Sequence, residues 1–337
     1  MQKFHLVVLA IALGLADAGA IHAASTETTT IVATARTLLE TLSDDQRRQA
    51  VFDFKDEVQR RRWSNLPTGI FQRRGLRVGD LTPPQRDAVS ALLAAALSPQ
   101  GYEKVGQIVE GDEVLRKSGG GGRLNFGRDE FYVSILGQPS TTEPWMIQFG
   151  GHHLALNLTL VGERGTLAPS LPAAQPAIYE LEGRTVRPLG REVDKAFALF
   201  SSLDEAQRRQ AILGFQIRDL VLGPGRDGQT IQPEGIKGSA LTEKQQAMLL
   251  DLAGEWIGIQ HESHAKTTMN EMRESIHETW FAWSGPAEQG GAAYFRIQGP
   301  TVHIEFAPQR MGGDPTRHIH TIYRDPRNDY GATWWKR

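Results

Sequence analysis

The chain has 337 residues, and its 37 Lys and Arg against 39 Asp and Glu give a formal net charge of −2. This balance lacks the basic excess with which proteins bind phosphate backbones, so we expect no nucleic-acid partner. The sequence contains no cysteine, which excludes disulfides, thiolate catalysis and cysteine metal ligands.

The N-terminal segment has the pattern of a secretory signal peptide. One lysine precedes an apolar run of ten residues, Leu6 to Leu15, and small residues follow. The run is too short to span a bilayer comfortably. We therefore expect residues 1–24 to be removed during export. The mature protein, with no membrane span, would then be periplasmic or extracellular.

An internal repeat follows the signal segment. The sequence QRRQA occurs at 46–50 and again at 207–211, and both copies lie in similar helical surroundings. Residues 81–97 and 241–257 also resemble each other and both open with Leu-Thr. This preserved order predicts a duplication.

The predicted organisation follows from that duplication. We expect repeat 1 at 25–167, a proline-rich linker at 168–190, and repeat 2 at 191–337, together forming one compact unit. Alignment of the last segments of the two repeats places Gly151 on Gly299 and Asn157 on Glu305.

Each repeat is predicted to begin with helices and to end with strands. Ser43 and Thr82 are suitable N-caps in the first repeat, as are Asp204 and Thr242 in the second. Helices are expected at 31–42, 43–60, 82–117, 192–202, 204–220 and 242–279. Strands are expected at 130–136, 145–150, 152–161, 279–285, 292–299, 301–308 and 318–324. The fold class is therefore α+β, with antiparallel strands of the two repeats meeting about a pseudo-twofold axis.

Four histidines are grouped in two of the predicted strands. His152 and His153 follow a Gly-Gly pair, and His318 and His320 form a His-x-His motif. Alternate residues of a strand share a face, so His318 and His320 point the same way while His152 and His153 point oppositely. We predict these four residues as metal ligands. Alternatively, they are buried hydrogen-bonding groups that lock a sheet.

Three further residues are candidates for catalysis. Glu305 shares a strand face with His303 and could be a ligand or general base. Arg324 could hold an anionic group of a substrate, with Asp325 beside it. A structural Arg–Asp pair at a strand end is the alternative explanation for the last two residues.

Three motifs resemble the domain-of-unknown-function family numbered 3500. They are QFGGHHLALNLT (148–159), YFRIQGPTVHIEF (294–306) and HIHTIYRDPRNDYG (318–331). The resemblance covers most of the mature chain. It implies no activity, and it places the candidate site residues in motif segments of the family.

The residues favour a metal-dependent hydrolase with a His/Glu site between the repeats and a small-molecule substrate. Zinc, iron, manganese or copper would suit such ligands, and we expect no organic cofactor. Two alternatives remain open. One is a non-enzymatic envelope protein that binds a metal or small ligand, and the other is an iron- or copper-dependent oxidoreductase.

Overall fold

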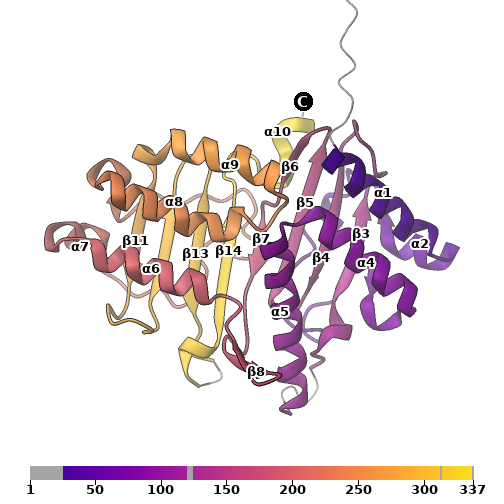
Figure 1. Cartoon of the computed structure of the whole chain (residues 1–337), viewed down its shortest axis with the longest axis horizontal. Coiled ribbons are helices and arrows are strands. Elements are labelled where there is room, and N and C mark those ends of the chain that lie inside the picture. The colour runs from indigo at the N-terminus through magenta and orange to yellow at the C-terminus, as the bar shows by residue number, and fades with distance from the viewer. Residues whose placement is uncertain (1–25, 120–123, 312, 336–337) are drawn as a thin grey trace, which may run out of the picture.

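The computed structural model describes residues 26–119, 124–311 and 313–335. Within them the chain is mixed α/β, with ten α-helices and one large mixed sheet. Figure 1 shows the long helices covering one face of this sheet. The predicted signal peptide, residues 1–24, lies outside the described residues.

The large sheet has twelve strands, and its main path runs β1-β3-β4-β5-β7-β14-β13-β12-β11-β10, with β2 beside β3 and β6 beside β5. The strands are β1 Val51–Phe52, β2 Leu76–Arg77, β3 Tyr132–Leu136, β4 Trp145–Gly151, β5 Leu154–Val161, β6 Arg164–Thr166, β7 Ser170–Pro172, β10 Ile236–Lys237, β11 Trp280–Ser284, β12 Tyr294–Gln298, β13 His303–Pro308 and β14 Ile319–Arg324. A separate hairpin pairs β8 Tyr179–Leu181 with β9 Arg184–Val186.

The sheet is mixed rather than wholly antiparallel as predicted, because β1 pairs with β3 in parallel. The parallel pairing is possible because the chain travels through β2, α4 and α5 before β3, which is a connection long enough for a crossover.

The α-helices are α1 Thr26–Glu40, α2 Asp44–Ala50, α3 Glu57–Arg60, α4 Pro83–Ala96, α5 Pro99–Lys117, α6 Gly190–Ser202, α7 Glu205–Ala211, α8 Glu243–Ile257, α9 Glu262–Glu274 and α10 Ala332–Trp335. Short 3-10 turns are η1 Val78–Asp80, η2 Arg128–Glu130, η3 Gly238–Ala240, η4 Ile276–Glu278, η5 Pro315–Arg317 and η6 Asp329–Gly331. None of the helices in the described residues is both long and apolar enough to cross a membrane.

Four of the predicted helices are shorter than expected or divided. The helix expected at 204–220 ends at Ala211, and the one expected at 242–279 is divided into α8, which ends at Ile257, and α9, which begins at Glu262. The helix expected at 43–60 ends at Ala50, because the next two residues pair with β3 instead. The helix expected at 82–117 breaks at Ser98, which caps α5 by accepting a hydrogen bond from the Gly101 amide. Pro99 lacks the amide that would continue the first helix, and its fixed φ suits the start of a new one.

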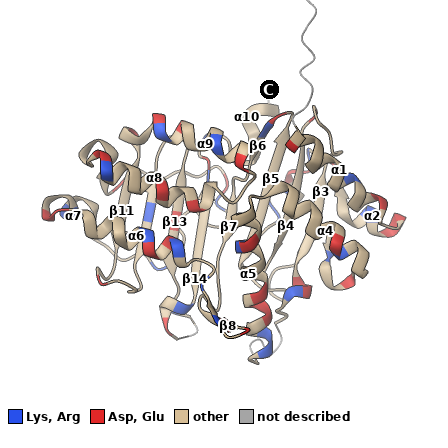
Figure 2. Cartoon of the chain, viewed as in Figure 1, with Lys and Arg blue, Asp and Glu red and all other residues tan. Residues whose placement is uncertain are grey.

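The predicted linker contributes to the centre of the sheet. Its strand β7 pairs with β5 on one side and with β14 on the other, so it joins strands from early and late parts of the chain. We call the part from α1 to β6 the first half and the part from α6 to α10 the second half. Acidic and basic residues are interspersed over the helices of both (Figure 2).

The sheet's helical face holds two hydrophobic cores, one in each half. Leu92, Val133 and Ile147 belong to the first, and Trp283 and Phe295 belong to the second. The other face of the sheet carries shorter irregular segments, and this is where the polar candidates of β13 and β14 point.

Candidate metal centre

The two histidine segments meet at the centre of the sheet. His152 and His153 form the two-residue turn between β4 and β5, whose ends Gly151 and Leu154 are paired. His318 immediately precedes β14, and His320 lies within it. The strand expected at 152–161 therefore begins two residues later, and the turn places His153 beside β14.

Three histidine side chains converge on one point. His318 Nε2 lies 3.0 Å from His153 Nε2 and 3.1 Å from His320 Nε2, and the third pair is 3.3 Å apart. Tetrahedral zinc with Zn–N bonds of about 2.0–2.1 Å places its ligand nitrogens about 3.3–3.4 Å apart. The three nitrogens thus form a triangle close to one face of such a tetrahedron. This buried histidine triad could bind a metal ion.

The outer nitrogens of two triad members are held by acceptors. His318 Nδ1 lies 2.9 Å from the carbonyl oxygen of Met311, and His320 Nδ1 lies 2.9 Å from a carboxylate oxygen of Asp219. A carbonyl and an ionised carboxylate only accept, so each Nδ1 carries the proton and each Nε2 carries a lone pair. Such partners orient metal-ligating histidines in proteins.

The pKa shifts of Asp219, His318 and His153 agree with neutral imidazoles beside an ionised carboxylate. Burial alone would raise the pKa of Asp219, but its interaction with His320 and hydrogen bonds from the Leu220 amide and Gln309 together outweigh burial and lower this pKa. Burial lowers the pKa of His318 to about 4, and burial together with the neighbouring histidines holds the pKa of His153 well below its usual range. Neutral imidazoles are the form that binds metals.

His153 has a backbone conformation that histidine seldom adopts. Its φ is 59°, in the left-handed region that glycine or asparagine usually occupies. Two hydrogen bonds hold it there: its amide donates to the Asn65 carbonyl at 3.2 Å, and its carbonyl accepts from the Ala173 amide at 2.8 Å. Strain maintained by neighbouring segments is typical of functional positions.

His152 lies beside the triad but belongs to a different contact. Its Nδ1 lies 2.6 Å from Asp112 of α5, and its ring lies 3.7 Å, centroid to centroid, from that of His153 at an interplanar angle of 34°. The predicted fourth histidine ligand therefore faces the helices, and its ring supports His153.

Glu305 does not face the triad. Its carboxylate accepts from the backbone amides of Val221 and Leu222 at 2.7 Å each, from the Tyr294 hydroxyl at 2.8 Å, and lies 2.9 Å from His303 Nε2. These contacts occupy both oxygens. Because Asp219 lies two residues before Val221, Glu305 fixes the segment that brings Asp219 to His320.

Arg324 is likewise engaged by protein groups. It donates to the carbonyls of Leu222 and Gly223 and forms ion pairs with Asp227 at 3.0 Å and Asp329 at 2.7 Å. The structure thus supports the structural explanation of this arginine, with Asp227 and Asp329 rather than Asp325 as its partners.

Asp325 is buried just beyond β14, and its Oδ1 accepts from the backbone amides of Arg327 and Asn328. Burial raises its pKa to about 6. The folded protein therefore holds a proton that the unfolded chain releases, and stability falls as the pH rises from about 4 to 6.

We expect Asp325→Asn to remove this fall, because the amide oxygen still accepts both hydrogen bonds and no charge is buried. At pH 7 the variant should be more stable by about 1–3 kcal/mol, from 1.36 kcal/mol per pKa unit. Urea unfolding at pH 4, 5, 6 and 7 measures this. A stability difference between Asp325→Asn and the wild type that stays the same at all four pH values would contradict this prediction.

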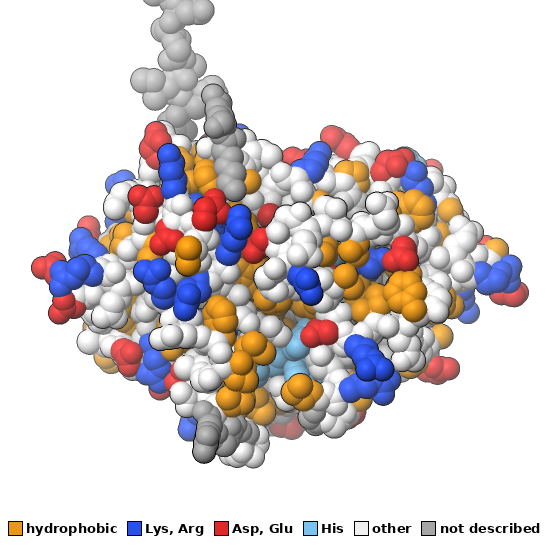
Figure 3. Space-filling view, turned by 180° about the vertical axis from the view of Figure 1, so that it is seen from behind, with side chains coloured by type: hydrophobic (Ala, Val, Ile, Leu, Met, Phe, Trp, Pro, Cys, Tyr) orange, Lys and Arg blue, Asp and Glu red, His pale blue; other side chains and the backbone are white. Residues whose placement is uncertain are grey.

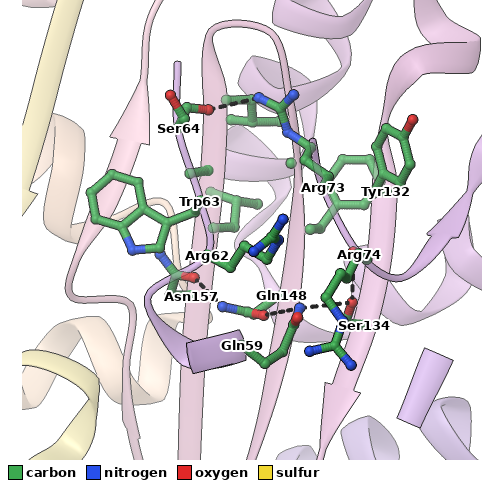
Figure 4. A pocket seen from close by; sticks show the side chains of 15 residues that line it. Gln59, Arg62, Trp63, Ser64, Arg73, Arg74, Tyr132, Ser134, Gln148 and Asn157 are labelled. Carbon is green, nitrogen blue, oxygen red and sulfur yellow. Dashed lines mark hydrogen bonds between the residues drawn. The ribbon is translucent and has the colours of Figure 1, made fainter. Parts of the chain in front are cut away.

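A small polar cavity lies beneath the segment that carries Asn65. Figure 4 shows Gln59, Gln148 and Asn157 joined by hydrogen bonds across the strands, with Arg73 donating to Ser64 above them. The cavity has a volume of about 30 Å³, which is enough for one or two water molecules. We interpret this hydrogen-bond network as the support of the segment that carries Asn65.

The triad lies on the face of the sheet away from the helices. Figure 3 shows histidine side chains there in a hollow bordered by hydrophobic side chains. Leu66, which follows Asn65, is 41% exposed, and Met311 is 80% exposed. Asn65 itself places its amide nitrogen 3.2 Å from His320 Nε2. An open approach of this kind is typical of catalytic metal sites rather than closed structural ones.

Comparison with known proteins gives a family without a described activity. The family model described as "Protein of unknown function (DUF3500)" matches residues 24–332. No curated protein and no solved structure matches the chain.

Proposed function

The chain belongs to the family of unknown function DUF3500, and we propose that it is a metal-dependent hydrolase centred on His153, His318 and His320. One observation carries the proposal. The lone pairs of His318 and His320 face each other at 3.1 Å, with both protons on the outer nitrogens. Two lone pairs this close repel each other unless a proton donor, such as His153 Nε2–H, or a cation lies between them. Because all three Nε2 atoms converge at the spacing of zinc ligands, we favour a ligand set over a hydrogen-bonded lock of the sheet.

A metal site with three neutral protein ligands and an open approach is well suited to hydrolysis. A divalent metal held by three protein nitrogens keeps a position for water and lowers the pKa of that water toward 7. Asp219 orients His320, and the Asn65 amide lies where it can donate to a bound oxygen. The exposed side chains of Leu66 and Met311 would contact an apolar part of a small substrate.

Elemental analysis of the untagged protein tests the proposal first. We expect about one equivalent of a transition metal in the wild type and almost none in His318→Ala/His320→Ala. Asp219→Ala should bind the metal about 10–100-fold more weakly, since it removes only the orienting partner. The exposed His277 supplies the control, because His277→Ala should retain the metal.

The activity assay follows from the identity of the metal. We expect ester, amide or phosphoester hydrolysis that chelation abolishes and the matching metal restores. Oxygen consumption by an iron- or copper-loaded protein would favour an oxidoreductase instead. A wild type that binds no metal after reconstitution with zinc, iron, manganese and copper would sink the proposal.

We also propose that the two halves arose by duplication. Ser43 and Asp204 each form a capping box with the glutamine three residues later, Gln46 and Gln207. Each of these glutamines pairs with a second glutamine, Gln85 in the first half and Gln245 in the second. Superposition of the halves in an experimental structure should require a rotation near 180°, and a very different angle would contradict the pseudo-twofold axis.

Export is the third element of the proposal, supported by the apolar N-terminal segment alone. N-terminal sequencing of protein recovered from the cell envelope or medium should begin near residue 25. Recovery of the intact N-terminus in the cytoplasm would contradict it.

A further inference from the structure

A second set of polar side chains crosses the sheet, remote from the triad. Trp280, Gln298, His303 and Arg324 are successive cross-strand partners on β11, β12, β13 and β14. Partners of this kind point to the same face, with side chains close enough to contact one ligand. His320 and Arg324 are four residues apart on β14, so this row lies about 13 Å from the triad at 3.3 Å per residue.

All four side chains line one cavity. Its volume is about 440 Å³, and its other walls come from the segment between Leu222 and Pro233 and from Pro300. Ligand-binding pockets of proteins typically measure about 300–1,000 Å³. The cavity is therefore large enough for a single-ring molecule.

Two neighbouring residues of this cavity, Gln298 and His303, offer acceptors. Gln298 donates through Nε2 to the Ile231 carbonyl at 2.6 Å, but its Oε1 is buried and finds no partner among the described residues. His303 directs Nε2 to Glu305 at 2.9 Å, so in the neutral ring Nδ1 is an acceptor. Buried acceptors are normally satisfied, and a ligand with two adjacent donors would satisfy both of these.

The charged groups in the cavity and beside it disfavour an anionic ligand. Arg324 is paired with both Asp227 and Asp329, and Lys237 is paired with Glu278 at 2.8 Å. No net positive charge is left on these groups for a carboxylate or phosphate. The Trp280 ring instead offers an apolar surface next to the two acceptors.

The corresponding row in the first half keeps an aromatic residue but lacks the two acceptors. There the successive partners are Tyr132, Gly150 and Ala155 on β3, β4 and β5. A row required only for pairing strands could be as small as this one. Gln298 and His303 of the second half are therefore not needed for strand pairing alone.

We propose that this cavity binds one ring of a neutral sugar. Vicinal hydroxyls of the ring donate to Gln298 Oε1 and His303 Nδ1, and its C–H face lies against Trp280. The site is separate from the triad, so its occupancy does not depend on the bound metal or on the proposed hydrolysis.

Saturation-transfer NMR and calorimetry with D-glucose, D-galactose, D-mannose and N-acetyl-D-glucosamine test the proposal on the full-length mature protein. We expect at least one sugar to bind with millimolar affinity, as a single ring with few contacts would. Gln298→Met and His303→Leu should each weaken that binding by about tenfold or more. Gln298→Met leaves the contacts of Glu305 intact and so remains informative if His303→Leu fails to fold.

The control is Gln210→Leu, on the exposed surface of α7, which should bind the same sugar as the wild type does. Metal content should be unchanged in Gln298→Met, which distinguishes this site from the triad. Absence of binding by all four sugars would overturn the proposal. So would binding that neither variant weakens, or binding of adenine, an aromatic amine, in place of any sugar.

Discussion

Glu305→Gln should lower the free energy of unfolding by about 3–5 kcal/mol, which is the typical cost of removing one partner of a buried ion pair and leaving the other partner in place. The carboxylate accepts from two backbone amides, one hydroxyl and one imidazole, and it is fully buried. An amide in its place offers only one accepting oxygen, so its NH₂ group must face a donor. Urea unfolding at pH 7 measures the loss.

Two further measurements make this prediction specific. Tyr294→Phe removes one donor and no charge, so it should cost only about 1 kcal/mol. Burial alone would raise the pKa of Glu305, but hydrogen bonds from His303 and the two amides keep it below its ordinary value. Its contribution to stability is therefore lost as the pH falls below about 4, and the gap between wild type and Glu305→Gln should narrow there. A gap under 1 kcal/mol at pH 7 would contradict the proposed role of Glu305.

Lys104→Met should be comparably destabilising, by about 3–5 kcal/mol at neutral pH. Lys104 of α5 lies 2.5 Å from Glu192 of α6 and 3.4 Å from Glu255 of α8, and all three are buried between the halves. Glu255 keeps Lys195 and Gln100 as partners, whereas Glu192 is left as an unpaired buried carboxylate.

The double variant Lys104→Met/Glu192→Leu provides the test of that mechanism. It should recover most of the loss, because replacing a whole buried pair by apolar residues is often neutral or stabilising. Lys266→Met, on the exposed surface of α9, should change the free energy of unfolding by less than about 0.5 kcal/mol. If the double variant is no more stable than Lys104→Met, the cost lies in packing rather than in an unpaired charge.

The seven strands predicted from the sequence are present, whereas seven short strands in the described part of the chain, β7 among them, were not predicted. The alternation in 318–324 gives the shared face of His318 and His320, and their nitrogens are 3.1 Å apart. The break at Pro99 could have been predicted from the proline and the preceding Ser98, since both are strong signals of a new helix. The end of α2 at Ala50 could not, because only the tertiary pairing of β1 with β3 stops that helix.

The triad could be predicted only in part. His153 was one of two adjacent candidates, and the backbone turn that selects it depends on contacts with Asn65 and Ala173. Asp219, Asn65 and the Met311 carbonyl lie in irregular segments that have no periodicity. Asp219 is 101 residues from the histidine it contacts. Contacts of this kind depend on the path of the whole chain, so one sequence does not reveal them.

The position of β7 gives the triad a mechanical role. His153 and His318 are 165 residues apart in sequence, and they meet only because β7 holds β5 and β14 together. A metal bound to both would act as a cross-link at the seam of the molecule. The two halves could then separate only if one histidine left the metal. We therefore expect the metal-bound protein to unfold in one cooperative step, with a melting temperature that rises with metal concentration.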